Sequence, residues 1–139
     1  MNNLPFVLEG RVVRGKQLGS QLGFPTANIV YDPAQRRWPQ EGVYAGLAKL
    51  DEDVYVTVLN QGRHPTAPGG SPTVEAHLLD YSGGPLYDCT LRLTYCLFLR
   101  AESKFPTLEA LKNQLAQDCE AARRWAENAG LSPQAERSI

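Results

Sequence analysis

Two short segments carry the side chains whose types and spacing could do chemistry. The first is Gly23-Phe24-Pro25-Thr26-Ala27-Asn28, in which a hydroxyl and a carboxamide stand two residues apart. In extended backbone, Thr26 and Asn28 point to the same side. Their oxygens together suit a hard cation such as Mg²⁺, which takes few protein ligands and keeps phosphates and waters. On spacing alone, a simple turn closed by the asparagine is the favoured interpretation, because short motifs recur by chance.

The second segment is Pro72-Thr73-Val74-Glu75-Ala76-His77. If it is a strand, Thr73, Glu75 and His77 share one face. A carboxylate on a strand otherwise directed to the core is unusual, because buried acids are costly without a partner. Such a glutamate could accept the proton of an alcohol that attacks a phosphoryl group. Taken alone, the segment fits a solvent-facing glutamate better.

A third match, Gly10-Arg11-Val12-Val13-Arg14-Gly15-Lys16, has the GxxxxGK spacing of a P-loop. The next residue is Gln17, where a P-loop has the Ser or Thr that holds magnesium. Its interior is strand-like and no helix follows, whereas a P-loop feeds its amides into a helix N-terminus. We therefore interpret the match as chance.

The elements that must position these segments are mostly strands. Val54, Val56 and Val58 alternate with Tyr55, Thr57 and Leu59, the period of a half-buried strand. The apolar face of the last strand is predicted to comprise Leu91, Leu93, Tyr95 and Leu97. The predicted strands are residues 6–13, 43–50, 54–59, 73–80 and 90–99, with a hairpin turn over 51–53.

The period changes after residue 106. Thr107 is a good N-cap, and Gly130 is a plausible C-terminal stop. A stripe at helical spacing is predicted to pack on the sheet, made of Leu108, Leu111, Leu115, Cys119 and Ala122. Several short strands followed by one helix predict an antiparallel barrel with a C-terminal helix.

Bulk composition narrows the function classes. The 139 residues suffice for one domain, expected to span 1–139 with a core of about 4–128 and a tail at 129–139. A net charge of −1 provides no broad positive field for nucleic acid or an anionic membrane. The N-terminus does not resemble a signal peptide. Three cysteines without CxxC spacing favour reduced thiols in the cytoplasm.

Several motifs along the chain, taken together, are identified as those of the riboflavin kinase family. The resemblance covers about Leu4 to Arg124, and the segment LGFPTAN is highly specific to that family. The motifs occur in the family order: Gly10 to Asn28, Gly42-Val43-Tyr44, Asn60-x-Gly62-x-x-Pro65-Thr66, Pro72-Thr73-Val74-Glu75-x-His77, Leu86-Tyr87, and Leu99-Arg100-x-Glu102-x-Lys104-Phe105.

The resemblance implies an all-β fold, a six-stranded antiparallel Greek-key barrel with a C-terminal helix. It implies transfer of the ATP γ-phosphate to the 5′-hydroxyl of riboflavin, giving FMN and ADP, with Mg²⁺ held by Thr26 and Asn28 and with Glu75 as the base. The implied nucleotide-binding residues are Gly15, Lys16, Gly19, Ser20, Gly23, Pro25, Leu78, Asp80 and Tyr87. The implied flavin-binding residues are Arg100, Ser103 and Phe105.

The chain departs from the family pattern at several positions. Ser20 stands where many members carry Lys or Arg beside the phosphates, Asp88 where glycine is usual, and His64 where Arg or Asn is frequent. Ala101 and Ser103 also make the expected flavin-contacting loop less similar to that of the family. Because Glu75, Thr26 and Asn28 are retained, we expect an active enzyme.

Three alternatives to a stand-alone kinase stay open at this point. The first is a regulator that kept flavin or nucleotide binding and lost turnover. The second is the excised kinase module of a bifunctional FAD synthetase, whose adenylyltransferase domain is not in this sequence. The third, a barrel that binds oligonucleotides, is disfavoured by the net charge. We expect a cytoplasmic monomer whose partners are riboflavin and ATP, with no nucleic acid and no membrane.

Overall fold

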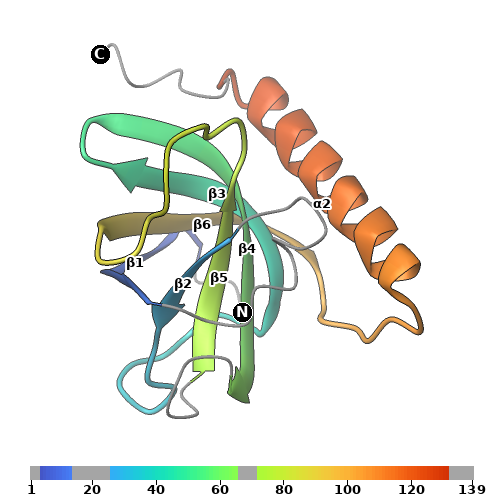
Figure 1. Cartoon of the computed structure of the whole chain (residues 1–139), viewed down its shortest axis with the longest axis horizontal. Coiled ribbons are helices and arrows are strands. Elements are labelled where there is room, and N and C mark those ends of the chain that lie inside the picture. Colours follow the sequence, from blue (N-terminus) through green and yellow to red (C-terminus); the bar gives the residue numbers. More distant parts are fainter. Residues whose placement is uncertain (1–3, 14–25, 66–71, 132–139) are drawn as a thin grey trace.

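The computed structural model describes residues 4–13, 26–65 and 72–131. Within these residues, six strands form a closed antiparallel barrel in the order β1-β2-β5-β4-β3-β6 (Figure 1). The strands are β1 (Phe6–Val13), β2 (Ala27–Val30), β3 (Gly42–Leu50), β4 (Asp53–Pro65), β5 (Pro72–Leu78) and β6 (Thr90–Arg100). Because β2 pairs with β5 and β1 with β6, the connections are of the Greek-key kind. The predicted barrel is confirmed.

Strand β2 is the element that the sequence pattern did not predict. It has four residues and lies between the segment 14–25, outside the described residues, and the loop that starts at Tyr31. A run this short shows too little alternation to stand out from a turn. Its pairing partners, β1 and β5, fix it in the sheet.

The barrel interior is apolar. Leu91, Leu93 and Tyr95 of β6 are 0% exposed and belong to the interior cluster. The Tyr95 hydroxyl donates to Gln61 Oε1 at 2.6 Å, and Gln61 Nε2 donates to the Pro39 carbonyl at 2.9 Å. The polar groups enclosed here are therefore paired, as buried polar groups must be.

A second apolar cluster lies outside the barrel, under helix α2 (Leu108–Asn128). Val56 and Val58 of β4 contribute to it, whereas Tyr55 and Leu59 face the interior, so the predicted alternation is confirmed. Figure 1 shows α2 lying along one flank of the barrel.

The predicted ends of the helix are confirmed. The Thr107 hydroxyl accepts from the Ala110 amide at 3.0 Å, as an N-cap does. Gly130 has a φ of 80°, the left-handed conformation that ends helices.

Two predicted core positions are wrong. Leu97 is 42% exposed. The register of the β3–β6 pairing shifts between Ala45 and Gly46, so Leu97 pairs with Ala45 and projects outward with it. Phe98 then pairs with Tyr44, and their rings meet edge to face at 5.3 Å. Leu108 is 57% exposed, because the first turn of α2 extends beyond the apolar cluster that the helix covers.

Candidate active site

One row of residues runs across neighbouring strands of the barrel. Asn28 of β2 pairs with Glu75 of β5, and Glu75 pairs with Asn60 of β4. The row continues from Asn60 to Val43 of β3 and from Val43 to Arg100 of β6. Directly paired residues on adjacent strands project from the same face, with their Cβ atoms about 5 Å apart. The register therefore joins sequence-predicted residues from three distant segments.

The row faces away from the barrel interior. The residues that flank Glu75, Val74 and Ala76, belong to the interior cluster, so Glu75 projects outward. The same holds for Asn28, between Ala27 and Ile29. Asn28 is nevertheless only 2% exposed. An outward-facing carboxamide in so enclosed a position is unusual for the outside of a small barrel.

Two side-chain oxygens in the row are poorly satisfied. Thr73 donates to Asn28 Oδ1 at 3.5 Å, a weak hydrogen bond. Asn60 Oδ1 is buried, and no donor in the described part of the chain lies within hydrogen-bonding distance of it. A buried oxygen without a donor carries a cost of about 1–3 kcal/mol. Both oxygens are therefore available to a ligand.

A cavity of about 490 Å³ adjoins one end of the row. Four sequence-predicted residues line it, namely Thr26, Leu78, Asp80 and Tyr87. Thr26 comes just before β2, and Leu78 ends β5, so the register of these two strands places both at the same mouth of the barrel. The structure brings together the described members of the predicted nucleotide set and one predicted metal ligand.

Two residues near this cavity have left-handed backbone. Asp80 has a φ of 63°, and its carboxylate accepts from the Arg123 guanidinium of α2 at 2.9 and 3.3 Å. Asp88 has a φ of 68°. A glycine, the residue that the resemblance leads us to expect at position 88, takes this conformation without strain. Aspartate tolerates it better than most residues, so the turn forms here despite the substitution.

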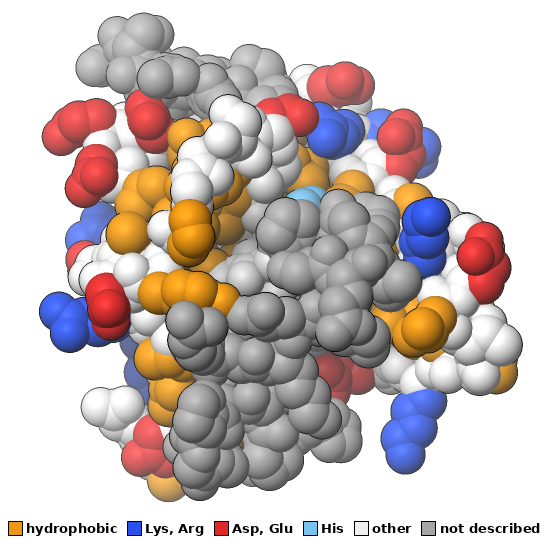
Figure 2. All heavy atoms as spheres, in the orientation of Figure 1, with side chains coloured by type: hydrophobic (Ala, Val, Ile, Leu, Met, Phe, Trp, Pro, Cys, Tyr) orange, Lys and Arg blue, Asp and Glu red, His pale blue; other side chains and the backbone are white. Residues whose placement is uncertain are grey.

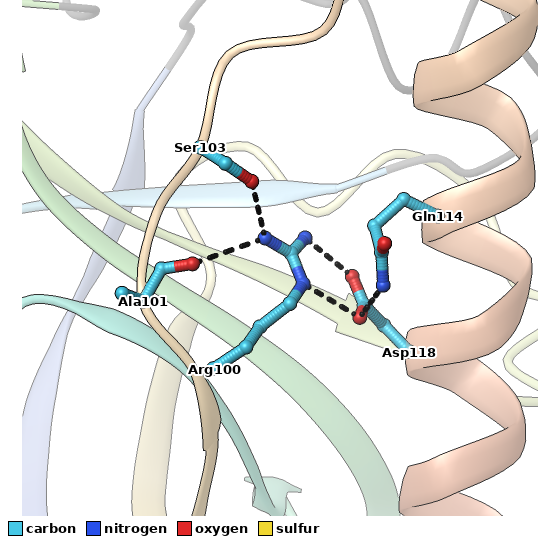
Figure 3. Close-up of polar contacts among 5 residues, drawn as sticks. All are labelled: Arg100, Ala101, Ser103, Gln114 and Asp118. Atoms are coloured by element: carbon cyan, nitrogen blue, oxygen red, sulfur yellow. Dashed lines mark hydrogen bonds and ion pairs between the residues drawn. The ribbon is translucent and has the colours of Figure 1, made fainter.

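The predicted flavin loop is held by an ion pair to the helix (Figure 3). The Arg100 guanidinium donates to both carboxylate oxygens of Asp118, at 2.9 and 2.7 Å, and to the Ser103 hydroxyl at 3.4 Å. Gln114 donates to the same carboxylate at 3.0 Å. The guanidinium also lies 5.7 Å from the centroid of the Phe105 ring. The three predicted flavin residues therefore lie together, with Asp118 as their anchor.

The loop reaches back to the polar row through Glu102. A Cβ added to Gly62 would fall against the Glu102 carboxylate, so that carboxylate lies directly over the Gly62 backbone. Gly62 is two residues beyond Asn60 on β4 and belongs to the same face. The close approach brings the Glu102 side chain against the outer face of β4. It places the predicted flavin loop beside the row that contains Glu75.

A larger hollow of about 720 Å³ lies at the other end of β2. Its lining includes Tyr31, Arg36, Trp38 and Gln61, and none of the sequence-predicted site residues. Size alone therefore does not identify the site, and we favour the smaller cavity because sequence-predicted residues line it.

The predicted residues Gly15, Lys16, Gly19, Ser20, Gly23 and Pro25 lie outside the described residues. Two described residues of the site, Asn60 and Asp118, were not among those predicted. Asn60 had a signal in the sequence: it continues the outward series Val56, Val58 with a polar side chain. Asp118 had none, because a helical acid four residues from Gln114 is an ordinary surface pattern.

The donors of the row and of the adjoining cavity mouth fit a magnesium ion. Thr26 and Asn28 offer neutral oxygens and Glu75 a carboxylate, all hard ligands. Among the described residues, the hydrogen bond that Asn28 Oδ1 would give up is the weak one from Thr73. In the described ranges, no cluster of three or more His, Cys, Asp or Glu side chains could hold a metal by itself. A cation here would depend on further oxygens from a phosphate or water, as Mg²⁺ commonly does.

Several known proteins are similar to this chain in sequence or in structure. The bifunctional riboflavin kinase/FMN adenylyltransferase of Pseudomonas fluorescens is 42% identical over 88% of this chain, which spans only 39% of that protein. The RNA-binding riboflavin kinase RibR of Bacillus subtilis is 32% identical over 90% of the chain and 53% of the relative. The crystal structure of riboflavin kinase from Trypanosoma brucei superposes with a TM-score of 0.66 at 26% identity, covering 91% of this chain and 80% of that one.

The family model described as "Flavokinase: Riboflavin kinase" matches residues 2–126. That range includes all six strands and most of α2. Together with the register that unites Asn28, Glu75 and Arg100, the match leads to one conclusion: the chain belongs to the riboflavin kinase family.

Proposed function

We propose that this chain transfers the γ-phosphate of ATP to the 5′-hydroxyl of riboflavin, giving FMN and ADP. The observation that carries the proposal is the row Asn28–Glu75–Asn60, which lies between the cavity lined by Thr26 and Tyr87 and the loop anchored by Arg100. The nucleotide occupies the cavity and the flavin contacts the loop, so that their reacting ends meet at Glu75.

The chemistry follows from positioning and charge. Glu75 accepts the proton of the attacking hydroxyl, which makes that oxygen a better nucleophile toward the γ-phosphorus. Thr26 and Asn28 would hold Mg²⁺, which when bound neutralises phosphate charge. The Arg100–Asp118 pair fixes the loop, so the flavin ring is oriented before the reaction and less entropy is lost at the transition state. No covalent phosphoenzyme is needed.

The partners that we propose are small molecules, and the location is the cytoplasm. Acidic and basic side chains are intermingled on the face shown in Figure 2, which agrees with the net charge of −1.

Cys89, Cys96 and Cys119 are free thiols. Among the described residues, no helix combines the length and apolar character that crossing a membrane requires. We further propose one monomeric domain of residues 1–139 that does not depend on nucleic acid, although one relative is named for RNA binding.

The direct test is to incubate the purified chain with riboflavin, ATP and Mg²⁺ and to separate flavins by chromatography. We expect FMN to form with one ADP released per FMN. Tight flavin binding without FMN would instead identify a binding regulator of the same fold.

The P. fluorescens relative has a second activity in its name. Adding FMN and ATP to this chain and finding FAD would show that the kinase reaction is not its whole function.

A further inference from the structure

Asn60 lies on the outward face of β4, next to Glu75 in the polar row. Its Oδ1 is buried, and the described residues supply it with no hydrogen-bond donor. Leaving a buried acceptor unpaired is unfavourable, and in native proteins such a group usually marks a place that a ligand or ordered water fills. Asn60 is also directly opposite Glu75, on the strand nearer the flavin loop. The position and the unpaired oxygen are independent observations that indicate the same ligand.

The chemistry of the reaction restricts which donor Asn60 can receive. The attacking 5′-hydroxyl has one proton, and in the proposed reaction that proton goes to Glu75. Asn60 Oδ1 must therefore accept from another group. The ribityl chain has a hydroxyl on the neighbouring carbon, at the 4′ position. A vicinal diol presents two donors side by side, and Glu75 and Asn60 present two acceptors on adjacent strands, with Cβ atoms about 5 Å apart.

We propose that Asn60 Oδ1 accepts a hydrogen bond from the 4′-hydroxyl of the ribityl chain and so selects substrates with a hydroxyl next to the reacting one. The inference rests on the proposed function. The contact holds the chain so that the 5′-oxygen faces both Glu75 and the γ-phosphate. A substrate without the 4′-hydroxyl leaves the Asn60 oxygen unpaired again, which is the situation in which polar sites discriminate most strongly.

A substrate–variant cycle tests the contact. Wild-type protein and Asn60→Ala are each assayed with riboflavin and with 4′-deoxyriboflavin, and kcat/KM is measured for all four combinations. We expect Asn60→Ala to lower kcat/KM for riboflavin about 10–100-fold, the loss of one buried hydrogen bond. For 4′-deoxyriboflavin, we expect wild type and variant to agree within about threefold, because the contact is already absent. An equal loss of kcat/KM on both substrates would overturn the assignment. It would indicate instead that Asn60 binds a water molecule or the metal ion.

Two further measurements separate this contact from a structural function. Because the oxygen is unpaired without substrate, Asn60→Ala should leave the thermal midpoint unchanged or raise it, and a lower midpoint or failure to fold would overturn the proposal. Asn60→Asp keeps an acceptor at the same place and should retain the preference for the 4′-hydroxyl; loss of that preference would contradict the contact. Asn113→Ala, on the exposed surface of α2, is the matched control and should match wild type throughout.

If wild-type protein forms no FMN from riboflavin, the proposed function itself fails. If wild-type protein forms FMN and the cycle shows no coupling, only the Asn60 contact fails. The two outcomes are therefore distinguishable in the same set of assays.

Discussion

Glu75 shows how much the surroundings of a single residue matter. In the sequence it could be an ordinary surface acid, and its type and spacing favour that interpretation when the segment is taken alone. In the structure it stands between two carboxamides, Asn28 and Asn60, on adjacent strands. Carboxamides carry no charge, so they can orient a hydroxyl or bind a cation without neutralising the base itself.

Thr26 tests the metal assignment at the residue scale. Thr26→Ala removes one of two neutral oxygens proposed for Mg²⁺ while keeping the backbone of the cavity mouth. We expect the Mg²⁺ concentration needed for half-maximal ATP binding to rise about tenfold, the scale of one lost polar contact. Titration calorimetry at fixed ATP measures it. Thr90→Ala, an exposed threonine at the start of β6, serves as control. Unchanged Mg²⁺ dependence in Thr26→Ala would remove Thr26 from the metal site.

Cys119 provides a pH-dependent test away from the site. Burial, with a smaller effect from the neighbouring Asp118 carboxylate, raises the pKa of this thiol from 9.0 to about 11. Folding thus favours the protonated thiol. The resulting stabilisation is complete below pH 9 and is lost as the pH rises toward 11. In a variant with Cys89→Ser and Cys96→Ser, alkylation by iodoacetamide should stay slow at pH 8 and reach half its maximal rate near pH 11. A midpoint near pH 9 would contradict the burial of this thiol.

At the scale of elements, alternation and helix caps made most of the fold predictable. Strand β4 and the Thr107 cap follow from the sequence because each depends on local periodicity or on one side chain. Strand β2 and the bulges of β6 do not, because both are imposed by pairing with distant strands. The same limit applies to the proposed site. Thr26, Asn28 and Glu75 could be predicted from the resemblance to the family, whereas Asp118 gains a partner in Arg100 only when α2 packs beside β6.

The Arg100–Asp118 pair links two of these elements and can be tested. Asp118 is 3% exposed, so Asp118→Ala leaves the Arg100 guanidinium partly buried without its carboxylate. We expect the free energy of unfolding to fall by about 3 kcal/mol, measured by urea denaturation, with a rise in KM for riboflavin as the loop loosens. Glu120→Ala breaks an exposed pair with Arg124 on the same helix and should change stability by less than about 0.5 kcal/mol. Equal effects of the two variants would refute the structural function of Arg100.

At the scale of the whole molecule, the order of the strands around the barrel is what brings the residues of the proposed site together. The polar row passes through five strands, and its order depends on β3 pairing with both β4 and β6. Without the β3–β6 pairing, Arg100 and its loop would have no fixed distance to Glu75. Closure also removes exposed strand edges, which otherwise favour aggregation.

Gly46 tests the β3–β6 pairing directly. A Cβ at Gly46 would overlap the carbonyl oxygen of Thr94 on β6, and backbone cannot move aside as a side chain can. We therefore expect Gly46→Ala to lower the free energy of unfolding by at least about 2 kcal/mol. Gly84→Ala is the control, because no atom lies within 4 Å of its added Cβ, and its change should stay within about 0.5 kcal/mol. Unaltered stability in Gly46→Ala would show that β3 and β6 do not approach so closely.

The base assignment of Glu75 is the central claim, and Glu75→Gln tests it most directly. The variant keeps the size and polarity of the side chain but cannot accept a proton at neutral pH. The measurement is the rate of FMN formation from riboflavin, ATP and Mg²⁺, together with the riboflavin dissociation constant from quenching of flavin fluorescence. The account predicts a rate at least about 100-fold below wild type, with flavin affinity changed by less than about threefold. FMN formation by Glu75→Gln at the wild-type rate would contradict it.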